Sequence, residues 1–372
     1  MKVDVGRFPP QYIFLIIGTI FGLAFLYSNP LFNKPDEVRH FWRAYQVSEG
    51  VFIPIKQGGA LGGIIPDSVI NIPNIYGANK TLNQPLRYFK QQSKTPLVKN
   101  KRSFVDFSNT ALYSPVVYMA SSLGIFIGKA INAPPVSLAY LGSLFNLIAW
   151  LVLCYFAIKT TPIGKYFLLA IALSPISIQQ ATSMSADTLT AGFSFILIAL
   201  ICRSLYENKI TKQHLYLILG TAALLALCKQ PYFILSLLCL IIPHKNFMTK
   251  KPKQPFLWKT FIISTTFITA ALWALAISYY FTPTRTDVAI TPYKQILLSL
   301  TNPMIFFNAL YTTYATTGLS LMSDFVSTLG IGKLIKLPLW FSILVYLTFF
   351  IGFILNLEQD QSHKKMGGLY YL

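Results

Sequence analysis

The stretch VSLAYLGSLFNLIAWLVLCYFAI, residues 136–158, decides the class of fold. It contains no charged residue, and as a helix it is long enough to cross the hydrocarbon core of a bilayer, which takes about 20 residues. The whole chain has the same character, because 54% of its 372 residues are hydrophobic, only 12% are charged, and the mean hydropathy is +0.53. A soluble domain carries about twice that fraction of charge. The sequence therefore predicts an integral membrane protein.

Apolar runs of similar length recur along the chain and predict an all-α polytopic protein with about eight transmembrane helices. The predicted spans are 12–28, 136–158, 166–182, 187–203, 214–228, 231–243, 260–281 and 339–357. A further apolar run at 112–131 is interrupted by Pro115, Gly124 and Gly128. Its place depends on the orientation of the other spans.

Basic residues set that orientation. The loop at 245–259 has five lysines and no acidic residue, and the loop after Leu200 is also basic, so both are predicted to be cytoplasmic. Lys2 and Arg7 place the N-terminus on the same side. The number of crossings is then consistent only if 112–131 does not cross, and we expect it to lie at the outer face as a juxtamembrane helix. The net charge of +19 does not indicate nucleic-acid binding, since the basic residues are spread over loops.

The predicted organisation has five segments. They are a signal-anchor transmembrane helix at 1–28, a large extracytoplasmic loop at 29–135 with juxtamembrane helices at 36–50 and 112–131, a transmembrane bundle at 136–281, a second extracytoplasmic segment at 282–338, and a last transmembrane helix with a cytoplasmic tail at 339–372.

The first outer loop opens with KPDEVRHFWRAYQVSEG, residues 34–50, which is dense in charges and aromatic rings. In a helix that starts at Asp36, one face carries the apolar residues Val38, Phe41, Trp42 and Tyr45. This pattern predicts an amphipathic helix that lies with its apolar side on the bilayer. Asp36 is also well placed to cap the helix, which would be a purely structural role.

Capping alone does not require the other charges of this motif, which are Glu37, Arg39, His40 and Arg43. Two carboxylates with two arginines and a histidine suit chemistry on a phosphate-bearing lipid. The carboxylate would take a proton from an attacking hydroxyl group, and the cations would stabilise the departing phosphate. The same orientation places Asp187 and Lys229 at the outer face, where charged side chains meet water, a partner or a cavity.

The string PDEVRHFWRAYQVSEG, residues 35–50, resembles the hallmark of a family of bacterial membrane proteins known as domain of unknown function 2142. Weaker pieces of the same pattern follow in order: YSPVVY at 113–118, SMSAD at 183–187, LCKQP at 227–231 and LGIG at 329–332. That family is similar to polytopic glycosyltransferases of the C-type fold, which take sugars from polyprenyl-phosphate carriers outside the membrane. The resemblance implies a multi-pass protein of the bacterial inner membrane. Relatives continue through further spans, so we expect the C-terminal part of this chain to be short.

The resemblance further implies a membrane glycosyltransferase that moves a sugar from a polyprenyl-phosphate carrier to an extracytoplasmic glycan or lipid-linked acceptor, with inversion. Asp36 would be the general base, with Glu37 as its neighbour or substitute. The phosphate would be held by Arg39, His40, Arg43 and Lys229. Asp187 would position the acceptor or bind a divalent cation, Mg²⁺ or Mn²⁺, together with Asp36. The structural alternative for Lys229 is a lysine that only extends its charge to the interface.

Two non-catalytic classes remain as alternatives. One is a flippase or transporter for a lipid-linked glycan, and the other is an assembly subunit of a surface polysaccharide pathway. A transporter should carry ionisable groups near the middle of the bilayer, on broken helices. The predicted spans carry almost none, and the charges gather at one face, which favours a reaction at the membrane surface.

Overall fold

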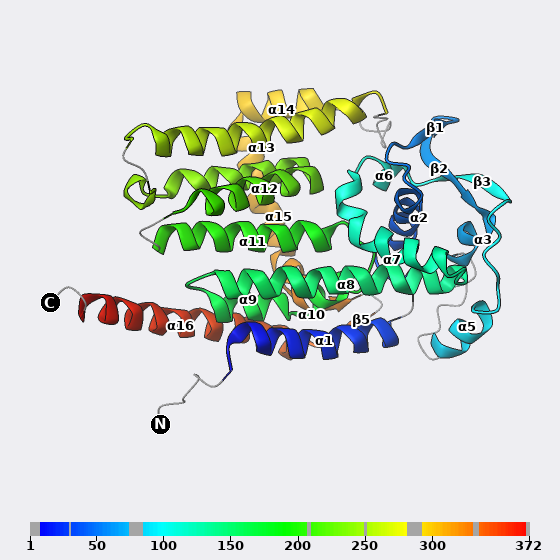
Figure 1. Cartoon of the computed structure of the whole chain (residues 1–372), viewed down its shortest axis with the longest axis horizontal. Coiled ribbons are helices and arrows are strands. Elements are labelled where there is room, and N and C mark those ends of the chain that lie inside the picture. Colours follow the sequence, from blue (N-terminus) through cyan, green and yellow to red (C-terminus); the bar gives the residue numbers. More distant parts are fainter. Residues whose placement is uncertain are drawn as a thin grey trace.

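The computed structural model describes residues 8–29, 31–73, 85–206, 210–248, 251–280, 292–329 and 335–369. Lys2, Arg7 and most of the LGIG motif lie outside these ranges. Long helices run side by side along the longest axis, and the first outer loop forms a smaller compact part at one end of them (Figure 1). The helices of the bundle are α1 (Pro10–Ser28), α8 (Pro135–Thr160), α9 (Lys165–Ala172), α10 (Pro175–Ala181), α11 (Asp187–Tyr206), α12 (Lys212–Cys228), the 3-10 helix η3 (Gln230–Ile241), α13 (Gln254–Ser278) and α16 (Leu339–Leu369).

Seven of the eight predicted spans each coincide with one helix of this bundle, and the span 166–182 falls on two. Among the described residues, α1, α8, α11 and α13 are long and apolar enough to cross a membrane. Shorter apolar helices are formed by α12, η3 and the stretch Leu339–Leu355 of α16. A 3-10 helix rises about 2.0 Å per residue, so the twelve residues of η3 reach about 24 Å rather than the roughly 18 Å of an α-helix. The protein is therefore a mainly helical membrane protein, and the number of eight crossings stays a prediction.

The prediction of one continuous helix over 166–182 is wrong. The structure has two short helices there, because α9 ends at Ala172 and α10 begins at Pro175. Proline lacks a backbone N–H, and its ring collides with the preceding turn, so a helix does not continue through it undisturbed. The break lies next to an apolar cavity described below.

The first outer loop surrounds a central helix, α2 (Glu37–Ser48). A three-stranded antiparallel sheet lies against α2, with β2 in the middle and Gly62 of β2 paired with Asp106 of β3. Sequence analysis did not anticipate this sheet. The other elements are β1 (Ile55–Gln57), β2 (Ala60–Pro66), α3 (Asp67–Ile70), α5 (Pro85–Gln92), β3 (Arg102–Asp106), α6 (Ser108–Ala111), η2 (Pro115–Tyr118) and α7 (Met119–Ala130).

Helix α7, which covers most of the run 112–131, packs closely on α8. A Cβ atom added at Gly124 would lie only 2.4 Å from the backbone oxygen of Leu141 in α8. Only glycine permits this approach of the two backbones. Since α2 packs on α7, the close contact also fixes α2 over the end of the bundle.

The prediction that α2 rests with its apolar side on lipid is wrong. Phe41 and Tyr45 are buried, but so are Glu37, on the same face, and Arg43, on the opposite side of the helix. The sheet, α6, η2 and α7 cover α2, and its apolar side chains belong to the largest core cluster of the described residues. The helix is thus enclosed within the compact part of the protein at the end of the bundle.

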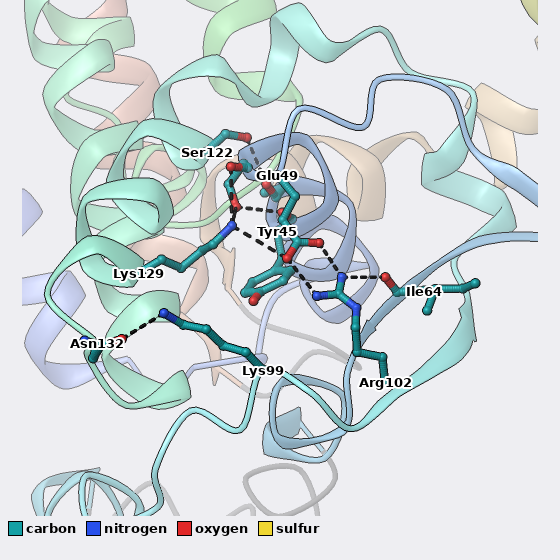
Figure 2. A network of polar contacts seen from close by, with 10 residues as sticks. Tyr45, Glu49, Ile64, Lys99, Arg102, Ser122, Lys129 and Asn132 are labelled. Carbon is teal, nitrogen blue, oxygen red and sulfur yellow. Dashed lines mark hydrogen bonds and ion pairs between the residues drawn. The ribbon is translucent and has the colours of Figure 1, made fainter.

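A polar network fastens the C-terminal end of α2 (Figure 2). Arg102 of β3 donates two hydrogen bonds to the carboxylate of Glu49, at 3.0 and 2.5 Å, and a third to the backbone oxygen of Ile64 at 2.8 Å. Lys129 of α7 lies 3.8 Å from the same carboxylate, and its ammonium group is 4.9 Å from the centre of the Tyr45 ring. These contacts join α2, the sheet and α7 into one body.

The predicted second extracytoplasmic segment, 282–338, contains a long helix. Within its described residues lie α14 (Pro292–Thr301), α15 (Pro303–Ser327), β4 (Thr328–Leu329) and β5 (Ile335–Lys336). Helix α15 passes behind the bundle in Figure 1 and contacts α10 and α16. It exposes many large apolar side chains, although sequence analysis assigned this segment to a connection.

Candidate functional site

Charged side chains from three distant parts of the chain meet at the end of the bundle that α2 covers. Asp187 begins α11 and Lys229 follows α12, and their side chains form an ion pair with 2.5 Å between Nζ and Oδ1. The charges of Asp187, Asp36 and Lys229 all act on the ring of His40 in α2. The structure therefore brings together four of the residues that sequence analysis singled out.

The turn that carries Asp187 is held by a residue that sequence analysis missed. The side-chain amide of Asn146 in α8 donates hydrogen bonds to the backbone oxygen of Ser183, at 2.6 Å, and to the hydroxyl oxygen of Thr188, at 2.9 Å. The backbone N–H of Asp187 donates to Ser185 Oγ at 3.1 Å. Asn146 is fully buried. An amide inside an otherwise apolar span is a signal that could have identified it.

Lys229 keeps its charge in this setting. Burial acts to lower the pKa of Lys229, but the hydrogen bond and the charge of Asp187 outweigh that effect, so the pKa is raised. Its ammonium group also lies 5.9 Å from the centre of the Tyr113 ring. Lys229 is thus a partly buried cation with one carboxylate partner and an aromatic neighbour.

His40 is placed between two tyrosines. Its Nδ1 lies 2.8 Å from the hydroxyl oxygen of Tyr118, and its ring centre is 6.0 Å from that of Tyr113. Burial lowers the pKa of His40 to about 4. The expected role of His40 as a cation on the phosphate does not fit this environment, because the imidazole is neutral near pH 7. A neutral imidazole can still orient a ligand through hydrogen bonds.

The pKa of His40 predicts how stability depends on pH. The unfolded chain binds more protons than the folded protein between the folded pKa of about 4 and the ordinary value of 6.5. The free energy of unfolding should therefore fall as pH drops through this range, by up to about 1.4 kcal/mol per pH unit. Thermal unfolding in detergent at pH 4.5 to 7.5 measures it. The His40→Gln variant should show a flatter dependence, whereas His244→Gln, at an exposed position in the short 3-10 helix η4 (His244–Asn246), should match the parent protein. Equal slopes for all three proteins would contradict the assignment.

Asp36 and Arg39 are the accessible charges of the motif. Asp36 precedes α2 with a left-handed φ of 55°, a conformation that aspartate tolerates better than most residues. The capping role that the sequence allowed for Asp36 is wrong, because its side chain makes no hydrogen bond to the start of the helix. Its Oδ1 instead accepts a hydrogen bond of 2.8 Å from Asn109. The side chains of Asp36 and Arg39 are 55% and 47% exposed and 4.0 Å apart. Both can therefore reach a substrate.

Glu37 has a different environment from Asp36. It is buried, and its carboxylate lies 3.5 Å from the ammonium group of Lys34, which is also buried. Lys34 in turn donates a 2.5 Å hydrogen bond to the backbone oxygen of Thr182, at the end of α10. Burial raises the pKa of Glu37 and lowers that of Lys34. Lys34 and Glu37 therefore connect the start of α2 to the end of α10, which is a structural role. The sequence analysis did not single out Lys34.

Arg43 is enclosed rather than presented to a ligand. Its guanidinium group donates hydrogen bonds to the side chain of Gln46 and to the backbone oxygens of Phe52, at 2.6 Å, and Tyr113, at 3.4 Å. The side chain is fully buried, and burial lowers its pKa to about 10. A lipid phosphate would have to displace these contacts, so the expected phosphate-binding role of Arg43 does not fit its surroundings.

Two cavities adjoin these residues. One, of about 510 Å³, lies beside the N-terminal half of α2 and is lined by Lys34, Asp36, Glu37, Val38, Arg39, Trp42, Val105 and Asp106. The other, of about 370 Å³, lies between α8, α9, α10, α11, α15 and α16 and is almost entirely apolar. Its lining includes Trp150, Phe167, Phe325 and Phe349, and also Asp187. Asp187 therefore belongs both to the ion pair and to the apolar cavity.

Asp36 and Asp187 were expected to share a divalent cation at this end of the bundle. Among the described residues, no group of three or more His, Cys, Asp or Glu side chains is arranged to hold a metal ion. Asp187 is paired with Lys229, and Asp36 is hydrogen-bonded to Asn109. Mg²⁺ is often bound by one or two carboxylates together with water and substrate phosphates. A divalent cation shared by Asp36 and Asp187 stays a prediction that would need those further ligands.

The sequence as a whole identifies the family. The family described as a predicted membrane protein, DUF2142, matches residues 19–367. The chain belongs to this family. The match extends from the middle of α1 almost to the end of α16, so it includes every residue of the candidate site. Comparisons with curated proteins and with solved structures found no match.

Proposed function

We propose that this DUF2142 protein is a membrane glycosyltransferase that moves a sugar from a polyprenyl-phosphate carrier to an extracytoplasmic glycan or lipid-linked acceptor. The observation that carries the proposal is that Asp187, which lines an apolar cavity, forms an ion pair with Lys229. A lipid-linked donor needs an apolar surface for its chain and a cation for its phosphate. Both meet at this point, within electrostatic range of the Asp36 and His40 side chains.

The reaction would be a single displacement. The acceptor hydroxyl oxygen attacks the anomeric carbon of the donor sugar and loses its proton to the carboxylate of Asp36. The bond between that carbon and the phosphate oxygen breaks, and its electron pair leaves with the polyprenyl phosphate. Because one bond forms on the face opposite to the bond that breaks, the configuration of the sugar is inverted.

The cationic side chains would act on the leaving group. Lys229 and Arg39 would stabilise the charge that develops on the phosphate, as fixed cations do in a site that holds little water. A divalent cation bound by Asp36 and Asp187 would supply the same stabilisation. The neutral His40, hydrogen-bonded to Tyr118, would orient the phosphate or the sugar without adding charge.

Proteoliposomes that contain the purified protein test this proposal. They would be loaded with a radiolabelled polyprenyl-phosphate sugar and with lipid-linked glycan extracted from bacterial membranes. We expect label to appear in the glycan together with an equal amount of free polyprenyl phosphate, and only when the acceptor is present. Movement of the labelled lipid between leaflets without any transfer would instead support the flippase alternative.

The location of the site in the bacterial inner membrane is part of the same proposal. Cysteines introduced singly at Asp36, Asp187 and Lys229 would be treated with a membrane-impermeant maleimide in intact spheroplasts. All three positions should react from outside. Reaction of position 187 only after the membrane is opened would place the site in the cytoplasm and contradict an extracytoplasmic reaction.

A further inference from the structure

The cavity of about 510 Å³ beside α2 differs in chemistry from the Asp187–Lys229 pair. Three acidic residues line it, against two basic residues, of which Lys34 is buried in its ion pair with Glu37. The remaining lining is apolar and includes the ring of Trp42. An excess of carboxylates disfavours a second anion, so a phosphate group is not the ligand that this lining suits.

Several polar atoms of the lining have bonding capacity to spare. Asp36 and Asp106 each use Oδ1 within the protein, the former for Asn109 and the latter for the N–H and hydroxyl groups of Ser108. The ring of Trp42 also lines the cavity, but its indole N–H has almost no accessible surface and is not available to a ligand there. A ligand that donates hydrogen bonds to the free carboxylate oxygens and presents an apolar face to the ring would therefore be stabilised by this lining.

A sugar ring fits these requirements. Its hydroxyl groups can donate hydrogen bonds to carboxylates, and the C–H face of the ring needs an apolar surface such as an indole. We propose that this cavity binds the acceptor as an uncharged, hydroxyl-rich sugar unit, packed against Trp42 and hydrogen-bonded to Asp106. The assignment of this sugar as the acceptor rests on the proposed function.

Asp36 connects this cavity with the rest of the site. It lines the cavity, and its charge also acts on His40 in the cluster with Asp187 and Lys229. A hydroxyl group of a sugar in the cavity would thus lie beside the proposed base.

Binding can be measured without any transfer reaction. The full-length protein in nanodiscs would be mixed with methyl glucoside, methyl galactoside and methyl mannoside, and saturation transfer to each glycoside would be recorded by NMR. At least one glycoside should bind. Trp42→Ala should weaken that binding by at least about tenfold, because it removes the aromatic surface against which the sugar packs. Asp106→Asn keeps an oxygen for Ser108 but loses the carboxylate, and it should weaken binding by about fivefold.

Asp67→Asn is the matched control. Asp67 lies in the same outer loop and pairs with Lys101 at 3.8 Å, but it does not line the cavity, so its variant should bind like the parent protein. Inorganic phosphate should not displace the glycoside. The inference is overturned if no glycoside binds the parent protein, if Trp42→Ala and Asp106→Asn both bind normally, or if phosphate competes.

The result of the glycoside-binding experiment is independent of the transfer assay, because the binding experiment contains no polyprenyl phosphate. Glycoside binding that depends on Trp42, in a protein that transfers no sugar, would support the cavity as a sugar site and contradict its role as an acceptor site in a transferase. Transfer that is normal in the Trp42→Ala and Asp106→Asn variants would overturn the inference and leave the proposed function standing.

Discussion

The Asp36→Asn variant is expected to lose sugar transfer by about 10²–10⁴-fold, the contribution typical of a general base. The side-chain amide has the same shape as the carboxylate and keeps an oxygen for Asn109, but it does not accept a proton. Asparagine also tolerates the left-handed φ of 55° at this position, so the variant should fold. Initial rates in proteoliposomes, normalised to the amount of protein in the membrane, measure the loss.

Asp67→Asn serves again as the control, since it removes a carboxylate from the same loop at a distance from the proposed reaction. Its transfer rate should equal that of the parent protein. Full turnover by the Asp36→Asn protein would exclude Asp36 as the base. The amount of membrane-inserted protein and its thermal unfolding would show whether a loss of activity in Asp36→Asn comes from a loss of folded protein.

The Lys229→Gln variant is expected to lower the rate of transfer by about 10²–10³-fold, as the removal of a group that stabilises transition-state charge does. The loss should appear in kcat, because Lys229 acts mostly on charge that develops as the phosphate departs. Lys212→Gln is the matched control, since Lys212 opens the same helix that Lys229 follows. It should leave the rate unchanged.

A double-mutant cycle separates the chemical role of Lys229 from a structural one. The ion pair with Asp187 is partly exposed, so its loss should cost at most about 1 kcal/mol of stability. If the pair is only structural, the Asp187→Asn/Lys229→Gln protein should regain the activity of Asp187→Asn. If Lys229 binds the phosphate, the double variant should stay as inactive as Lys229→Gln, while Asp187→Asn alone keeps more activity. Recovery of activity in the double variant would reject phosphate binding by Lys229.

The positions of the helices could be predicted from the sequence because hydropathy is a local property. The run at 136–158 became α8, and the orientation argued from basic loops brought Asp187 and Lys229 to one end, where the structure pairs them. The break at Pro175 escaped notice because the run 166–173 is apolar and Ile176 and Ile178 extend it beyond the proline. Its proline was the available signal.

The environments of the motif residues could not be predicted, because distant parts of the chain create them. Arg43 is bonded to the backbone of Phe52 and Tyr113, and Lys34 to that of Thr182. A helical wheel for α2 distinguishes apolar from polar faces but does not show that a sheet covers the polar one. The motif therefore identified the right region, while the separation of accessible Asp36 from buried Glu37 required the fold.

The hydrogen bond from Lys34 to the backbone oxygen of Thr182 links the first outer loop to the helix bundle. It joins residues 148 positions apart, and Asp187 follows Thr182 by only five residues. A shift of α2 away from the bundle would leave a buried ammonium group without its carbonyl and its carboxylate, which is costly in a dry interior. Such a shift is therefore favourable only if Thr182 and the turn at 183–186 move with α2. We therefore expect the first outer loop and the turn that carries Asp187 to move together as one unit.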